Sequence, residues 1–271
     1  MHGTIDRGRV ILLTISGVIL VGALIEFIQV ALAAAGADRL GIDIGYWYPL
    51  YAQRWLETGT PYLPHQLAGP YHVSGQDFLF PPLALYVFAP FLVLPKVIWW
   101  IVPIVALALC WRRFRPALWT FPILALVLLW PRTIGQIVVG GSDLWVSAAV
   151  ALGLLYAWPF VLIVIKPSFL PLALLGVRSR RWWIAAGVVL LAAIPFGTLW
   201  FDYVTAIRNS GLPLSYSLLQ LPIVLAPIVI WIGRTRPTAL AIDGRAGVRR
   251  PGWLRWPGWL PDPRKRVTAS S

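Results

Sequence analysis

The sequence has few charged residues and almost no cysteine. Only 12% of its 271 residues are charged, whereas about 25% is usual in soluble domains. Its one cysteine, Cys110, excludes an internal disulfide and a cysteine-rich zinc site. The chain also lacks a Walker loop, a dinucleotide fingerprint and a Gly-x-Ser-x-Gly elbow. Nucleotide-dependent and serine-hydrolase chemistry therefore have no support in its motifs.

Apolar residues are abundant instead. They make up 59% of the chain, and the mean hydropathy is +0.75. A single globular core at this length cannot hide that excess from water. The 16 Trp, 24 Pro and 23 Gly residues are typical of membrane helices, where interfacial Trp is enriched and Pro and Gly are tolerated. The composition excludes a soluble globular enzyme and predicts an all-α polytopic membrane protein.

The net charge of +13 is concentrated near the end of the sequence. Residues 234 to 271 hold nine basic residues against two acidic ones, Asp243 and Asp262, and so carry +7 of that charge. Basic residues beside the last apolar segment predict a cytoplasmic tail that is attracted to the anionic inner leaflet. We therefore expect membrane lipids as partners of the tail, and no nucleic acid.

The apolar segments predict about eight membrane helices within residues 1 to 233. The first run, Val10 to Ala35, has about 26 residues, long enough to cross a bilayer as an uncleaved anchor. Arg7 and Arg9 place its start inside, so both termini are expected in the cytoplasm of a cell with this protein in its plasma (inner) membrane. The further segments are Leu79 to Leu94, Val97 to Trp111, Ala117 to Trp130, Ile137 to Trp158, Pro159 to Gly176, Trp182 to Trp200 and Leu212 to Ile232.

Two features of these segments leave the count open. Several are shorter than the usual 17–25 residues, so one pair can be a single kinked helix or a re-entrant hairpin. If all eight segments cross and the first starts inside, Arg178, Arg180 and Arg181 lie inside, as the positive-inside rule requires. The same topology places Arg112, Arg113 and Arg115 outside, against the rule.

Residues 36 to 78 form the one long polar segment before the tail, and we expect this loop to lie outside. It is net acidic, with four acidic residues against two basic ones. The acidic residues are Asp38, Asp43, Glu57 and Asp77. Helical spacing relates Tyr48, Tyr51, Ala52, Trp55 and Leu56. The spacing predicts a short amphipathic helix on the membrane, ended by Gly59.

A series of short motifs begins within this loop and continues beyond it in a definite order. Asp43 precedes the expected Tyr-rich helix, and Gly59-Thr60-Pro61-Tyr62 follows it. Later come Phe80-Pro81-Pro82-Leu83, Gly135-Gln136, and Lys166-Pro167-Ser168 ahead of the basic cluster at residues 178 to 181. This order resembles the GT-C membrane glycosyltransferases, specifically glycosyltransferase family 87, which uses polyprenyl-phosphate-mannose. The resemblance covers roughly residues 5 to 232, and we expect the chain to be short of that family's C-terminal helices.

The resemblance implies transfer of mannose or another sugar from a polyprenyl-phosphate donor to a lipid or glycan acceptor on the outer face. Such a donor requires no further cofactor. A base must accept the acceptor proton, and Asp43 is our candidate, although a helix N-cap or an ordinary loop carboxylate would also explain it. Cations must offset the departing phosphate, and we assign Lys166, with Arg132 and Arg208 behind it. Lys166 could instead extend to a membrane interface.

The same resemblance implies a sugar pocket and leaves alternatives for some of its members. The candidate pocket residues are Tyr46, Tyr48, Tyr62, Asp77, Gln136 and Asp143. Gln136 and Asp143 would also fit as polar contacts between helices. His65 and His72 share the outer loop with Asp77, but their spacing matches no standard ligand pattern, so no metal is expected.

Two other classes of function remain open from the sequence. A non-catalytic lipid carrier or assembly protein would keep the fold without the reaction. A small-molecule transporter would commonly show paired half-repeats, and this sequence has no such internal symmetry.

Overall fold

The computed structural model describes residues 7–212 and 218–235. Every regular element within those ranges is a helix and none is a strand, which confirms the all-α fold class. The elements are α1 (Arg7–Gly36), η1 (Asp43–Trp47), α2 (Tyr48–Thr58), α3 (Pro64–Ala68), α4 (Ala84–Phe88), η2 (Ala89–Leu92), α5 (Ile98–Phe114), α6 (Thr120–Leu129), α7 (Pro131–Val139), α8 (Asp143–Tyr156), η3 (Trp158–Ile165), η4 (Pro167–Phe169), α9 (Leu170–Ala173), η5 (Leu174–Gly176), α10 (Arg180–Ala193), η6 (Ile194–Phe196), α11 (Leu199–Ser210) and α13 (Leu221–Ile232). The tail prediction for residues 236 to 271 lies outside the described residues.

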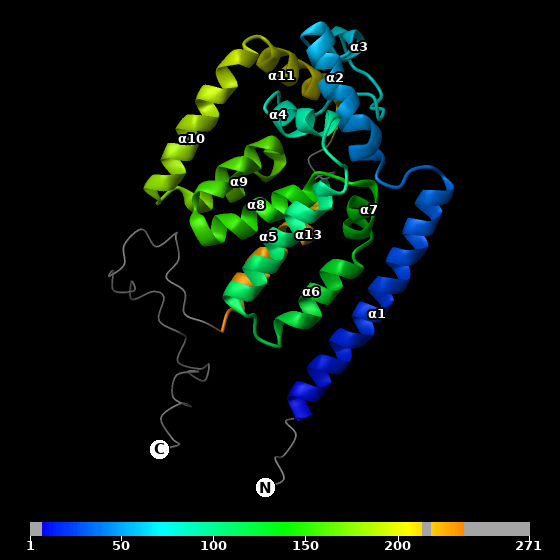
Figure 1. Cartoon of the computed structure of the whole chain (residues 1–271), viewed down its shortest axis with the longest axis vertical. Coiled ribbons are helices and arrows are strands. Elements are labelled where there is room, and N and C mark those ends of the chain that lie inside the picture. The colour runs from blue at the N-terminus through cyan, green and yellow to red at the C-terminus, as the bar shows by residue number, and fades with distance from the viewer. Residues whose placement is uncertain (1–6, 213–217, 236–271) are drawn as a thin grey trace.

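The long helix α1 runs along one side of the other helices (Figure 1). Of its 30 residues only Ser16 and Ala23 are buried, because it packs on little besides α6 and α7. By length and composition, α1 is the one described helix that could cross a membrane by itself. Two bent helix pairs would raise the number to three if each pair is a single span.

Both bent pairs break where the sequence disfavours a straight helix. Between α6 and α7 the axis turns by 61°, at Trp130, whose extended ψ of 122° precedes Pro131. Between the α10–η6 helix and α11 it turns by 88°, at Gly197, which has a φ of 44°. The sequence allowed one kinked pair, and the structure has two. It also has helices α7 and α11, which the apolar segments did not predict as separate elements.

The segment Leu79 to Leu94, predicted as a full span, contains only short helices and does not run the length of the molecule. At its start, the carbonyl oxygen of Phe80 accepts a hydrogen bond from Tyr62 of the outer loop, 3.1 Å away. Just beyond its end, Lys96 donates to the carbonyl oxygen of Gly45, 2.9 Å away. Both ends of the segment therefore contact residues 36 to 78, and only the short helices α4 and η2 lie between them.

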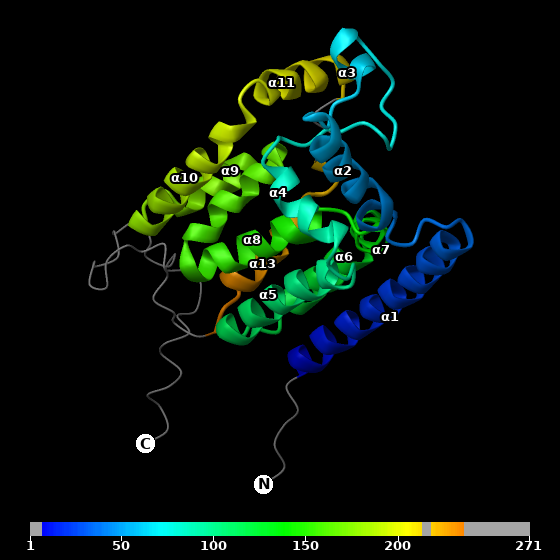
Figure 2. The same ribbon diagram turned by 45° about the horizontal axis from the view of Figure 1, so that its top comes forward.

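Helix α5 begins beside the outer loop and carries the chain to the opposite end of the molecule. There Arg115 leads into a turn that pairs with the end of α13, since Ala117 N–H donates to the carbonyl oxygen of Gly233 at 2.7 Å. The start of α1 lies at this same end in both views (Figures 1 and 2). Basic residues gather here from Arg7, Arg9, Arg112, Arg113, Arg115 and Arg234, and we call this end the basic end.

Helix α10 lies parallel to α1 in both views, so its arginine-rich start points the same way as Arg7 (Figures 1 and 2). Since α5 ends at the basic end, its last-turn arginines lie at the same end of the molecule as the start of α1. Both ends of residues 79 to 94 contact the outer loop, so α5 runs from that loop toward the basic end.

Residues 158 to 176 form a helical hairpin with Lys166 at its tip. The elements η4, α9 and η5 return toward the end of α8, where a Cβ on Gly176 would lie 2.9 Å from the carbonyl oxygen of Ala157. The prediction of one continuous segment from Pro159 to Gly176 is therefore wrong. The chain leaves the helix at Lys166 (φ −135°, ψ 84°) because Pro167 disfavours a helical conformation in the residue before it.

The predicted amphipathic helix is present as α2 and is confirmed to end at Gly59, whose φ is 80°. Its apolar face packs on the protein itself, since the Tyr48 ring stacks on Phe88 with centroids 4.2 Å apart. Tyr51 also contacts Phe78 at 5.3 Å between centroids. Leu56 was expected on that face but is 62% exposed. This aromatic core fixes α2, and the turn that precedes it, against α4 and α5.

Candidate active site

Asp43 opens a five-residue π-helical turn, η1, that continues directly into α2. Such wide turns are frequent at functional sites because they shift side chains out of helical register. The residue in the N-cap position is Ile42, and no side chain caps the turn. The interpretation of Asp43 as a helix N-cap is therefore wrong, and its half-buried carboxylate is left for another role.

Two glycines bring this turn against the connection between α7 and α8. Gly41 N–H donates to the carbonyl oxygen of Val138 at 2.8 Å. A Cβ on Gly140 would lie 2.8 Å from Cγ2 of Ile44, so a larger residue does not fit between the two segments. This close approach sets Asp43 beside the start of α8, where Asp143 is the first residue.

Lys166 reaches the same place from the tip of its hairpin. Its Nζ donates to Oδ1 of Asp143 at 2.5 Å and to Oε1 of Gln220 at 2.8 Å. The Asp143 side chain is fully buried and that of Lys166 is only 15% exposed. The interpretation of Lys166 as a residue that extends to a membrane interface is therefore wrong, because its amine points into the protein.

Electrostatics join Asp43 to this buried pair. The pKa of Asp43 is raised from 3.8 to about 6, and burial is the main cause. The Tyr48 hydroxyl, 3.5 Å from Oδ2, and the charge of Lys166 act in the opposite direction and lower that pKa. The negative charge of Asp143 also contributes to the rise in the pKa of Asp43. Burial also holds the pKa of Tyr48 well above its usual value, so that hydroxyl stays protonated as a donor. We call Asp43, Tyr48, Asp143, Lys166 and Gln220 the Asp43–Lys166 cluster.

Four of the residues singled out from the sequence thus come together: Asp43, Tyr48, Asp143 and Lys166. Gln136 lies nearby, since a Cβ on Gly141 would collide with its side-chain oxygen. Gln220 was missed because it adjoins an apolar run. A lone polar residue at the edge of such a run is the signal that could have identified it, since polar side chains often join membrane helices.

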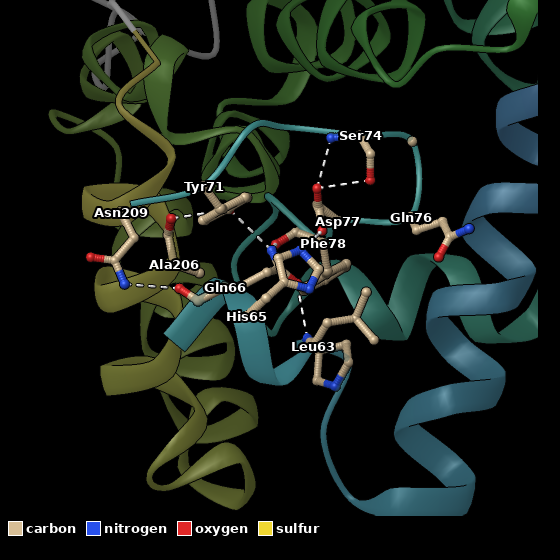
Figure 3. Close-up of polar contacts among 12 residues, drawn as sticks. Leu63, His65, Gln66, Tyr71, Ser74, Gln76, Asp77, Phe78, Ala206 and Asn209 are labelled. Atoms are coloured by element: carbon tan, nitrogen blue, oxygen red, sulfur yellow. Dashed lines mark hydrogen bonds and ion pairs between the residues drawn. The ribbon is translucent and has the colours of Figure 1, made fainter. Parts of the chain in front are cut away.

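Other expected pocket residues make contacts outside the Asp43–Lys166 cluster, among them Asp77 in the outer loop (Figure 3). Both oxygens of Asp77 are engaged, Oδ1 by His65 at 2.8 Å and Oδ2 by the backbone N–H and hydroxyl of Ser74. The Tyr62 hydroxyl donates a hydrogen bond to the carbonyl oxygen of Phe80. Tyr46 is 54% exposed and packs on its neighbour Trp47. The assignment of Asp77, Tyr62 and Tyr46 to the sugar pocket is therefore not supported.

Hydrogen bonds that the sequence did not indicate connect the outer loop to α11 (Figure 3). The buried Gln66 donates to the carbonyl oxygen of Phe78 and to the Tyr71 hydroxyl, both at 3.1 Å. Tyr71 in turn donates to the carbonyl oxygen of Ala206, and Asn209 donates to that of Gln66. Among the residues that the structure describes, no group of three metal-binding side chains is present.

The two arginines expected to support Lys166 lie elsewhere. Arg132 is exposed at the opposite end of α7 from Gly140. Arg208 is exposed in the last turn of α11, the helix that packs on α3 of the outer loop. Lys166 is therefore the one candidate phosphate-binding cation that the fold brings beside Asp43.

No protein-family model, curated protein or solved structure matches this chain. The resemblance to glycosyltransferase family 87 therefore stays a prediction from the motifs, and the function must be proposed from the site.

Gly140→Ala is expected to destabilise the protein and to disturb Asp43, because the new methyl group would collide with Ile44 at a φ of 78°. Gly59→Ala is a matched control, with a φ of 80° and no atom within 4 Å of its Cβ. Backbone strain alone should cost each variant about 1–3 kcal/mol. Thermal unfolding should show the larger loss for Gly140→Ala. Equal losses would mean that the close approach of η1 to α7 is unimportant.

Proposed function

We propose that the protein is a membrane glycosyltransferase that moves a sugar from a polyprenyl-phosphate donor to a hydroxyl of a lipid or glycan acceptor. The observation that carries the proposal is the Asp43–Lys166 cluster. It joins a half-buried carboxylate with a pKa of about 6 to a buried amine in one site. A base poised near neutral pH and a fixed cation are the two groups that such a transfer needs.

In this proposal the acceptor oxygen attacks the anomeric carbon as its proton passes to Asp43. The bond between that carbon and the phosphate oxygen breaks, and the polyprenyl phosphate leaves with the bonding electrons. Lys166 offsets the negative charge on the departing phosphate. The amine has three N–H groups, and within residues 7–212 and 218–235 Asp143 and Gln220 accept from two of them, so the third is proposed to bind a phosphate oxygen.

The proposed membrane arrangement keeps about eight crossings but changes two of them. Residues 79 to 94 are removed as a crossing, and the hairpin of residues 158 to 176 contributes two instead of one. The crossings are then α1, α5, α6, α8, η3, the return from η4 to η5, α10 and α13. The basic end lies in the cytoplasm, with both termini, and the outer loop with Asp43 lies on the other face.

Cysteine labelling tests this arrangement in a Cys110→Ala background, which removes the buried native thiol. A cysteine at Ser74 should react with an impermeant reagent in intact cells or spheroplasts. Cysteines at Arg113 and Ser270 should react only after permeabilisation. Reaction of the Arg113 position in intact cells would restore residues 79 to 94 as a crossing. Protection of the Ser74 position would contradict the outer placement of the site.

The transfer itself is tested with membranes that contain the full chain and radiolabelled polyprenyl-phosphate sugars. Labelled product should form with the wild-type protein and not with membranes that lack it. Binding of the donor without transfer to any acceptor would favour a lipid carrier. Uptake of free sugar into vesicles would favour a transporter.

A further inference from the structure

A second hollow lies away from the Asp43–Lys166 cluster, between η3, the first helix of the hairpin, and helix α10. It encloses about 400 Å³, within the range of about 300–1,000 Å³ that small-molecule sites occupy. Trp158 and Leu162 line it from η3, and Arg181, Ile184, Ala185 and Val188 line it from α10. Apart from Arg181, every lining side chain is apolar. We call this hollow the η3–α10 groove.

One end of the groove is strongly basic. Arg181 lines it with the apolar part of its side chain, and Arg178, Arg180 and Arg181 are all exposed where α10 begins. No acidic residue occurs between Asp143 and Asp202, so the sequence offers these arginines no nearby acidic partner. The charge of this end therefore complements an anion.

Exposed tryptophans mark the same end of the groove. Trp158 is 45% exposed and Trp183 is 60% exposed. Trp and Arg side chains are typical of the level of the lipid headgroups in a membrane protein. In the proposed arrangement we assign this level to the leaflet at the basic end, because α10 runs in the same direction as α1 (Figures 1 and 2).

The rest of the groove extends away from Arg181 into apolar surroundings. From Arg181 to Val189 the helix rises by about 12 Å, at 1.5 Å per residue. One leaflet contributes about 15 Å of hydrocarbon. The groove thus is an apolar channel about as deep as one leaflet, with exposed arginines beside one end.

We propose that the η3–α10 groove binds an anionic glycerophospholipid of the cytoplasmic leaflet, with its phosphate on Arg181 and an acyl chain along α10. A zwitterionic lipid carries a cation of its own beside the phosphate, so Arg181 favours the anionic headgroup. The inference rests on the membrane arrangement of the proposed function, and does not depend on sugar transfer.

The test uses the purified full chain in detergent, with phosphatidylglycerol or phosphatidylcholine added in equal amounts and bound lipid counted by native mass spectrometry. The wild-type protein should retain phosphatidylglycerol preferentially. Arg181→Gln should reduce that preference about five-fold, the factor that corresponds to one basic residue at an anionic surface. Ala185→Phe should fill the channel and reduce retention of both lipids.

Arg113→Gln is the matched control, since it removes the same charge from the same end of the molecule but lies outside the groove. It should leave the preference unchanged. An equal loss in Arg113→Gln would show general attraction to the basic end and overturn the site. Equal retention of the two lipids by the wild-type protein would also overturn it. If Ala185→Phe does not fold, Arg181→Gln, which lies at an exposed position, still tests whether the groove prefers the anionic lipid. Because no sugar transfer is measured, a failure here is distinct from a failure of the proposed reaction.

Discussion

Asp43→Asn is expected to lower the rate of sugar transfer by about 10²- to 10⁴-fold, the usual contribution of a general base. Asparagine keeps the size of the side chain and its ability to accept from Tyr48, but it cannot take up the acceptor proton. The fold and the binding of donor should persist. The measurements are kcat with labelled donor, the donor Kd and the melting temperature in detergent.

The pH profile distinguishes a base from a merely structural carboxylate. Asp43 must be deprotonated to act, so the wild-type rate should fall as the pH drops through about 6 and level off above it. The residual rate of Asp43→Asn should lack this dependence. Tyr48→Phe removes a hydrogen bond that lowers the pKa of Asp43, so it should move the midpoint to higher pH. A wild-type midpoint that survives in Asp43→Asn would contradict the assignment.

Lys166→Met is expected to lower the free energy of unfolding by about 3–5 kcal/mol, because it leaves the fully buried Asp143 without its cation. The penalty is raised by the second oxygen of that carboxylate, Oδ2, which is buried and has no hydrogen-bond partner among the described residues. Thermal or denaturant unfolding in detergent measures the effect.

The double variant Asp143→Leu/Lys166→Met should recover most of the lost stability, since replacing both members of a buried ion pair by apolar residues is often neutral. It should still fail in transfer, because the cation for the phosphate is gone. Lys96→Met is the control, as Lys96 is exposed and binds only the backbone at Gly45 in the described structure. If Lys166→Met costs no more than Lys96→Met, Lys166 is not held as an ion pair in a buried site.

The sequence by itself determined the features that depend on neighbouring residues. The long apolar run of α1 follows from composition, because hydropathy is a sum over adjacent positions. The helix α2 follows from the spacing of Tyr48, Tyr51 and Ala52, and its end from Gly59, since both obey the 3.6-residue period and local backbone preferences. The candidates Asp43 and Lys166 stand out because ionisable residues are scarce among apolar segments.

Only the tertiary structure decided which way the segments run. A window of apolar residues has the same hydropathy whether it crosses a bilayer or turns back. The contacts of Phe80 and Lys96 with the outer loop, and of Gly176 with Ala157, join residues from different segments. Those contacts return both ends of residues 79 to 94 to the outer loop and make a hairpin of residues 158 to 176.

The candidate site was likewise beyond the reach of the sequence. Asp43 and Asp143 meet because the methyl-free Gly140 lets η1 approach α7 closely, and Lys166 joins them because Pro167 turns the hairpin at its tip. Neither the close approach of η1 nor the position of the hairpin tip produces a periodic pattern in the sequence, since each depends on the shape of a distant surface. The pKa of Asp43 follows for the same reason, because burial and the charges of Lys166 and Asp143 are properties of the packed molecule and not of its local sequence.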